Sequence, residues 1–259
     1  MKSITRKTML YKTGVEYGDY TMNHVLGCTH GCKYPCYAYM MKKRFGEVLS
    51  YEDWLDPRIV SNTLEILDEE IPRLKDKIKS VQLCFTTDPF MYGYEEISTM
   101  SIAAIKKLNA SGIKCTVLTK GILPIELADC SMENEYGITL ISLDEEYRQR
   151  MEPGAAPYVE RIQALRALSE RGCQTWVSIE PYPTPNLIEQ DLATILETLD
   201  FADKIIFGRT NYSKDVSAYK EHRDFYNRCA SQVIEFCNAN NIAYHIKDGT
   251  ITSNEESND

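Results

Sequence analysis

Three cysteines, Cys28, Cys32 and Cys36, stand close together in the sequence with the spacing C-x3-C-x3-C, and the next cysteine is Cys84. Thiolates are soft ligands that bind iron–sulfur clusters or zinc. Three thiolates on a cluster of four irons leave one iron free to bind another ligand. The spacing therefore predicts a [4Fe–4S] cluster with an open iron, held on a loop.

Two other interpretations of these cysteines remain open at this point. A Cys3His zinc site would need His30 or His24 as its fourth ligand, and the thiols could also be purely structural. Zinc motifs usually contain two ligand pairs separated in sequence. That arrangement is missing here, which favours the cluster.

The number and distribution of all the cysteines indicate whether the protein resides in a reducing or an oxidising compartment. The chain has nine cysteines, an odd number, and those outside the loop are scattered, which is typical of reduced thiols. No apolar run reaches the ~18–20 residues of a membrane span, and the N-terminus lacks the apolar core of a signal peptide. We therefore expect a cytoplasmic protein without membrane partners.

Charge is unevenly distributed along the chain. The formal net charge is −9, yet residues 1–50 carry eight Lys and Arg against three acidic residues. The negative balance disfavours sequence-independent binding to duplex DNA, which depends on neutralising phosphates. The cations near the cysteines form either a collar that attracts an anionic ligand or a solvated helix face.

Hydrophobic periodicity predicts alternating strands and helices, which is typical of an α/β fold with a parallel sheet. We expect a partial (β/α) barrel with about six to seven parallel strands. An irregular lead-in (1–19), a single domain (20–250) and an acidic, disordered tail (251–259) are the expected divisions. The expected strands are 20–26, 81–85, 113–118, 137–143, 174–179, 204–207 and 243–246, and the expected helices are 37–45, 52–70, 95–110, 124–132, 158–170, 187–199 and 216–238.

Polar side chains follow most of these strands. In parallel α/β folds the functional groups gather at the carboxyl ends of the strands. Loops are polar in any case, and Asp and Thr commonly cap helices, so no single position is decisive. The agreement between strands predicts one site, formed with the cysteines by Thr87, Asp88, Lys120, Ser142 and Glu180.

The segment Gly27–Ala38 resembles the radical S-adenosylmethionine (SAM) signature, in the form found in the spore photoproduct lyase-like group. The opening also resembles radical SAM proteins that occur as genetically mobile pairs. The resemblance extends over about residues 20–182 through the segments Thr86–Phe90, Leu118–Lys120, Ser142–Glu146 and Met151–Ala155, and through Arg161.

This resemblance implies a partial barrel of the radical SAM type that binds a [4Fe–4S] cluster and SAM. It implies reductive cleavage of SAM to a 5′-deoxyadenosyl radical that abstracts hydrogen, with flavodoxin or ferredoxin as electron donor. A mobile pair would add a second radical SAM protein as partner. By the same resemblance the three cysteines ligate iron and Lys120 pairs with the SAM carboxylate. Contacts to other polar groups of SAM would come from Thr87, Asp88, Ser142 and Glu180.

One residue departs from the family pattern. Pro35 lengthens the last spacing, and the resemblance assigns the aromatic residue before the third cysteine to the adenine. Tyr34 is displaced from Cys36 by this insertion. Tyr37 is therefore our first alternative for the adenine contact.

Cys84 is a candidate hydrogen donor by the same resemblance. Spore photoproduct lyases carry such a cysteine three residues before the Asp, whereas Cys84 stands four residues before Asp88. Strand side chains alternate between faces, so a shift of one residue reverses the direction. We therefore interpret Cys84 as a buried apolar residue.

The leading hypothesis is a radical SAM enzyme of unknown substrate. The alternatives are a DNA-lesion repair lyase and a non-catalytic iron–sulfur or zinc protein that senses or binds a partner.

Overall fold

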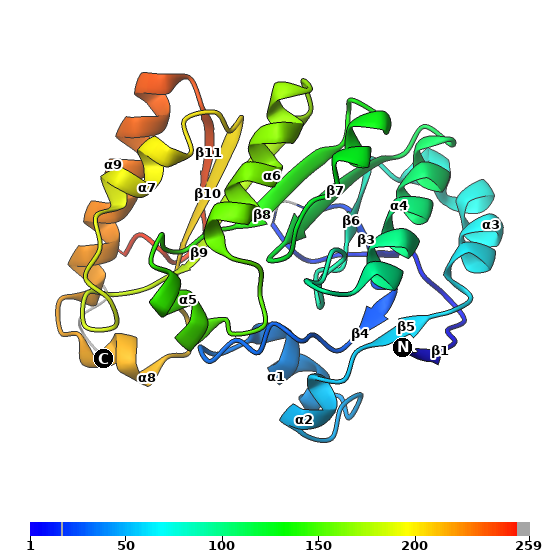
Figure 1. The fold of residues 1–259 in the computed structure, drawn as a ribbon, viewed down its shortest axis with the longest axis horizontal. Helices are drawn as coiled ribbons and strands as arrows, with labels where there is room; N and C mark the ends of the chain where they lie inside the picture. The colour runs from blue at the N-terminus through cyan, green and yellow to red at the C-terminus, as the bar shows by residue number, and fades with distance from the viewer. Residues whose placement is uncertain (17, 253–259) are drawn as a thin grey trace.

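The computed structural model describes residues 1–16 and 18–252, so most of the predicted acidic tail (251–259) lies outside the described residues. An eight-stranded sheet with the order β11-β10-β9-β8-β7-β6-β3-β2 forms the body of the molecule (Figure 1). All neighbours pair in parallel except β2 and β3, which are antiparallel. The predicted α/β partial barrel is confirmed. The strands are β2 (Tyr11–Lys12), β3 (Tyr20–Met22), β6 (Ser80–Leu83), β7 (Lys114–Thr119), β8 (Glu135–Thr139), β9 (Gln174–Tyr182), β10 (Lys204–Arg209) and β11 (Ala243–Ile246).

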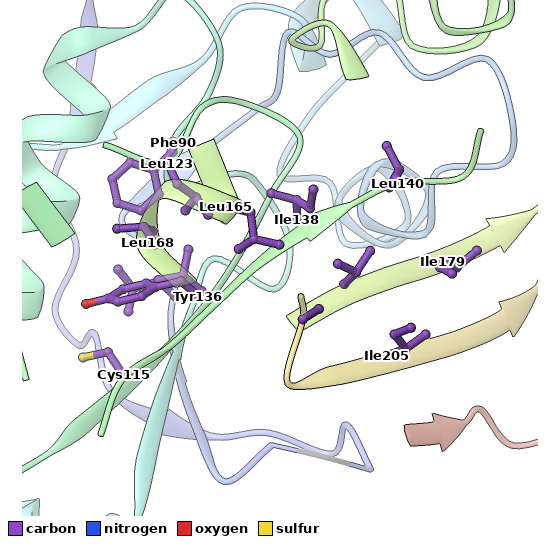
Figure 2. Close-up of a cluster of buried hydrophobic side chains, with 14 of the residues drawn as sticks. Phe90, Cys115, Leu123, Tyr136, Ile138, Leu140, Leu165, Leu168, Ile179 and Ile205 are labelled. Carbon is purple, nitrogen blue, oxygen red and sulfur yellow. The ribbon is translucent and has the colours of Figure 1, made fainter. Parts of the chain in front are cut away.

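Helices connect the parallel strands and cover one face of the sheet (Figure 1), because a parallel connection must cross from one end of the sheet to the other. Tyr136 and Ile138 of β8 belong to the same fully buried cluster as Leu165 and Leu168 of α6 (Figure 2). The connecting helices are α3 (Thr63–Leu74), α4 (Glu95–Asn109), α6 (Tyr158–Glu170), α7 (Leu192–Thr198) and α9 (His222–Asn240).

A second, three-stranded sheet with the order β1-β5-β4 supports the cysteine loop. It was not predicted. The expected strand 20–26 is divided between the two sheets, and residues 1–19, expected to be irregular, contribute β1 and β2. Figure 1 places the small sheet and its helices below the main sheet. The elements are β1 (Lys2–Ile4), β4 (Val25–Leu26), β5 (Arg58–Val60), α1 (Tyr37–Arg44) and α2 (Tyr51–Trp54).

The expected helix over 52–70 is wrong. The segment contains the end of α2, the strand β5 and the start of α3. Pro57 explains the interruption, because a proline lacks the backbone N–H and disfavours helical backbone at the residue before it. The β-branched residues Ile59 and Val60 then pair with β1, and Ile59 also pairs with β4.

Several other helices also differ from the expected ones. The expected helix 216–238 is two helices, α8 (Lys214–Ala218) and α9, and residues 124–132 form only the 3-10 turn η2 (Ile125–Asp129). A second 3-10 turn, η1 (Lys75–Lys77), follows α3. The helix α5 (Glu145–Met151) was not predicted, although Asp144 caps it by accepting a hydrogen bond from the Tyr147 N–H at 2.7 Å.

In the part of the chain that the structure describes, no helix combines the length and apolar character that a bilayer crossing requires.

Candidate cofactor site

A cavity of about 140 Å³ lies between the cysteine loop and the carboxyl ends of β6, β7 and β8. It gathers the predicted iron ligands with several of the predicted cofactor contacts. Its lining includes Cys28, Cys32, Cys36, Thr87, Asp88, Thr119 and Lys120, together with His30, Gln82, Cys84 and Thr139.

Close backbone contacts hold the cysteine loop against its neighbours. Gly154 packs on the loop so tightly that a Cβ there would lie 2.0 Å from the Thr29 carbonyl oxygen, and its N–H donates to His30 O at 3.0 Å. On the other side, Gly27 has φ +93°, a backbone conformation that glycine adopts readily. This conformation lets the Cys28 N–H donate to Trp54 O at 2.8 Å.

Asp88 joins this loop to the sheet. Its carboxylate accepts hydrogen bonds from His30 Nε2 (2.8 Å), Thr119 Oγ1 (2.6 Å) and the Lys120 backbone N–H (2.8 Å), and from the Phe90 N–H (2.8 Å). Burial alone would raise the pKa of Asp88, but His30 and the other donors hold it below its ordinary value. Both carboxylate oxygens are thus occupied by protein donors. This geometry makes Asp88 an anchor for the loop through His30.

We expect Asp88→Asn to loosen that anchor, because an amide group would turn N–H donors toward groups that themselves donate. Leaving buried donors unsatisfied costs about 1–3 kcal/mol. The expected result is a lower free energy of unfolding in urea and weaker retention of iron on gel filtration. Asp144→Asn, which changes an exposed helix cap outside the cavity lining, is the control. Full stability and iron retention in Asp88→Asn would contradict the anchoring role.

Lys120 lies at the edge of the cavity within a buried network. Its Nζ is 3.6 Å from Cys32 Sγ and 3.1 Å from the Glu152 carboxylate, and it also donates to the Tyr34 hydroxyl. Tyr34 in turn donates to Glu152 at 2.6 Å. Burial opposes the charge on Lys120, but Cys32 and Glu152 raise its pKa above the ordinary value, so the ammonium is retained.

The three cysteines are partly buried and line the same cavity. Burial raises the pKa of Cys28 well above its ordinary value, and Asp88 and Cys32 raise it further. Burial also raises the pKa of Cys32, which Lys120 partly offsets. Thiolates in this cavity therefore need positive charge beside them, and iron would supply it. The donor set fits an iron–sulfur cluster.

The two histidines considered for a zinc site are otherwise engaged. His30 bonds Asp88, and His24 lies 2.7 Å from Ser101 Oγ and 3.5 Å from Cys84 Sγ. Within residues 1–16 and 18–252, no three His, Cys, Asp or Glu side chains are grouped to hold a single metal ion. The ligands of one zinc ion converge within about 2.0–2.3 Å of it, whereas cysteines on a cluster bind different irons. The arrangement favours a cluster over zinc.

Comparison with known proteins agrees with this chemistry. The family model described as the Radical SAM superfamily matches residues 22–199. The chain belongs to the radical SAM superfamily. The cofactors of this superfamily are a [4Fe–4S] cluster and SAM, and its enzymes generally need a reductant such as flavodoxin or ferredoxin.

Two related proteins share 26% identity with this radical SAM chain, and both are uncharacterised. One, from Acidianus two-tailed virus, aligns over 202 residues, 72% of this chain and 64% of its own length. The chain thus spans less than two thirds of that relative. The other, from Methanocaldococcus jannaschii, aligns over 223 residues, 84% of this chain and 81% of its own.

The fold resembles that of spore photoproduct lyase. The lyase complexed with dinucleoside spore photoproduct has a TM-score of 0.68 at 15% identity, covering 93% of this chain and 80% of the lyase. A mutant of that lyase with bound AdoMet and dinucleoside spore photoproduct gives the same values. At this identity the similarity concerns the fold.

The other predicted SAM contacts are dispersed in this radical SAM fold. Tyr37, the first residue of α1, is 62% exposed and lies outside the cavity lining. The buried Ser142 hydroxyl accepts a hydrogen bond from the Asp144 N–H, and Glu180 pairs with Lys247 at 3.5 Å. Thr87 lines the cavity and donates to Val25 O at 3.2 Å. Of the SAM set, Thr87, Asp88 and Lys120 share the cavity with the cysteines.

Cys84 is also among the residues that line this cavity, and it packs in a buried apolar cluster with Val25, Met91 and Ile97. Strand β6 ends at Leu83, and Cys84 has φ +55°, so the alternation of a strand does not extend to it. Its thiol lies 3.5 Å from His24 Nδ1 in a buried apolar cluster, which agrees with its interpretation as a buried apolar residue. Burial raises the pKa of its thiol to about 12, which keeps the S–H protonated at neutral pH.

Glu152 and Arg161 are site residues that the sequence left without a role. Both are fully buried and joined by an ion pair at 2.8 Å, and Glu152 connects this pair to Lys120 and Tyr34. The only signal was their place in the family-like segment, because a carboxylate in a loop gives no indication of burial.

Proposed function

We propose that this protein is a radical SAM enzyme in which Cys28, Cys32 and Cys36 ligate a [4Fe–4S] cluster. We further propose that residues 20–250 form its single radical SAM domain. When bound, the cluster supplies one electron to SAM, which is cleaved to methionine and a 5′-deoxyadenosyl radical that takes hydrogen from a substrate. The observation that carries the proposal is the set of three thiols beside Lys120 in one cavity.

The residues of the chain have separate parts in this proposal. Asp88 fixes the cysteine loop through His30, while Lys120 offers its ammonium to the SAM carboxylate at the edge of the cavity. Tyr34 is the anchor of Lys120 rather than an adenine contact, because its hydroxyl is held between Lys120 and Glu152.

Anaerobic reconstitution tests the proposal directly. We expect a brown protein with about four irons per chain and 5′-deoxyadenosine formed on addition of dithionite and SAM. A colourless protein that takes up zinc and forms no 5′-deoxyadenosine would refute it. A full cluster without SAM cleavage would favour the non-catalytic iron–sulfur alternative.

We expect Lys120→Ala to weaken SAM binding about 10- to 100-fold while iron content stays unchanged. A charge-assisted contact is worth about 1.5–3 kcal/mol, which corresponds to this range. Equilibrium binding of SAM to the reconstituted protein measures the effect. Lys114→Ala is the matched control, because Lys114 begins β7 at the end opposite to the one that Lys120 follows. Equal SAM affinity in the two variants would remove Lys120 from the site.

A lyase acting on DNA lesions is the second candidate, favoured by the position of Cys84 in the cavity. A protonated thiol is the form that can return a hydrogen atom to a product radical, and Cys84 is kept in that form. Irradiated DNA added to the 5′-deoxyadenosine assay, with lesion content followed, tests this candidate. Unchanged lesion content would exclude it.

A further inference from the structure

The outer side of the cysteine loop borders a second hollow, here called the outer groove, of about 420 Å³. Its walls are the segment Cys32–Cys36, the side chains Tyr39, Met40 and Tyr51, and the segment Tyr212–Asp215. Cys32 and Cys36 line both this groove and the inner cavity. The cysteine loop is therefore a thin wall between the cofactor site and solvent.

Exposed apolar side chains gather beside the outer groove. Tyr212 (80% exposed) and Met40 (38%) line the groove, and Tyr37 (62%) directly follows Cys36 of its wall. Tyr37 and Met40 are three residues apart on α1 and share a face. Exposed apolar residues scattered singly are ordinary on a protein surface, whereas a cluster marks an interaction site.

The same region presents exposed cations. Lys33, Lys43, Arg44 and Lys214 are exposed, and within the described residues none of them forms an ion pair. Lys33 and Lys43 lie over the rings of Tyr51 and Tyr39.

Two of the four nearby acidic side chains are paired with cations. Glu47 is paired with Lys42, and Asp53 with Arg58, which leaves Glu52 and Asp215 as facing acids. The surface therefore carries a surplus of positive charge on a chain whose net charge is −9.

We propose that this surface binds an acidic one-electron carrier protein. The surface, here called the docking surface, is formed by Lys33, Tyr37, Met40, Lys43, Arg44, Tyr212 and Lys214. The inference rests on the proposed function, because the electron is used only where a cluster is bound. The carrier loses one electron and the cluster gains it. Charge complementarity selects this face, since the negative remainder of the chain repels an acidic partner. Figure 1 shows α1 and α2 at the lower edge of the molecule.

The test compares two reductants on cluster-loaded protein, with iron content checked first. Stopped-flow absorbance follows cluster reduction by reduced flavodoxin or ferredoxin and, separately, by dithionite. In the triple variant Lys33→Glu/Lys43→Glu/Arg44→Glu we expect carrier-driven reduction to slow about tenfold or more, because electrostatic steering changes association rates by about 10–10³-fold. Dithionite-driven reduction should change less than about twofold. Raising salt should slow the carrier-driven reaction of the unmodified protein.

Two further variants keep the result interpretable. Lys75→Glu/Lys77→Glu/Lys79→Glu changes net charge equally at exposed lysines on and after η1, and we expect it to keep the full carrier rate. Tyr212→Ser/Lys214→Glu alters the groove without touching the cysteine loop, and we expect it to slow the carrier reaction as the first triple does.

Four outcomes would overturn the inference. The first is an equal rate of carrier-driven reduction in the first triple variant and the unmodified protein, and the second is equal slowing of that rate in the η1 control. The third is that neither carrier reduces a full cluster. The fourth is that the docking surface binds another radical SAM chain instead of a carrier. The last would appear in light scattering as a dimer that the triple variant dissociates while carrier rates stay unchanged. A protein that assembles no cluster refutes the proposed function itself, which the iron assay separates from failure of docking.

Discussion

Replacing any one of Cys28, Cys32 and Cys36 by Ala is expected to remove nearly all iron from the reconstituted protein and to abolish 5′-deoxyadenosine formation. All three thiols line one cavity and no fourth cysteine of the chain lies in their loop. The thiolates hold the cluster in the protein, so the loss of one ligand leaves a second iron without a protein ligand. Iron and sulfide content with the visible absorption of the cluster measure the result.

Cys130→Ala is the matched control for this prediction. Cys130 is a half-buried cysteine that follows η2, and its thiol is not among the residues of the cavity. It should keep full iron content. A single-cysteine variant of the loop that keeps both iron and activity would show that the cluster is bound elsewhere.

Glu152→Gln is expected to lower the free energy of unfolding of the metal-free protein by about 3–5 kcal/mol. Glu152 and Arg161 are both fully buried, and removing one partner of a buried pair leaves an uncompensated charge. The same change frees Lys120 and Tyr34, so SAM affinity should also change. Urea unfolding measures the first effect. The exposed Glu146→Gln, which alters charge equally, should stay within about 0.5 kcal/mol of the unmodified protein.

The acid dependence of stability gives an independent check on Glu152. Burial alone would raise the pKa of its carboxyl, but Lys120 and Arg161 lower it from 4.5 to about 2. A lowered pKa contributes stability that is present above the unfolded value and is lost as pH falls through the folded value. The unmodified protein should therefore lose stability between about pH 4.5 and 2 more steeply than Glu152→Gln. Identical slopes would show that Glu152 is not held as a buried carboxylate.

The sequence by itself determined the class of chemistry and the type of fold. The three cysteines lie within nine residues, so their spacing alone predicts a cluster. Residues 95–110 and 158–170 have a helical period that the structure follows closely. Residues after the strands β6 and β7 were assigned to one rim because parallel strands end on the same side. Asp88 and Lys120 lie there as predicted.

The tertiary structure decided what each polar group does. Asp88 was assigned to SAM, yet its carboxylate is occupied by His30, Thr119 and two backbone donors. Three of these four donors come from segments distant in sequence, which local patterns do not reveal. The burial of Glu152 depends on Gly154 allowing its loop to reach the cysteine loop.

The periodicity of side chains in the sequence predicts structure only within a regular helix or strand. Strand alternation does not extend to Cys84, because this residue follows the last residue of β6 and has φ +55°. Pro57 divided a predicted helix for the same kind of local reason. Spacing along the chain fixes which ligands can act together. Only the folded packing fixes which donors satisfy a carboxylate and which side chains remain available for a cofactor.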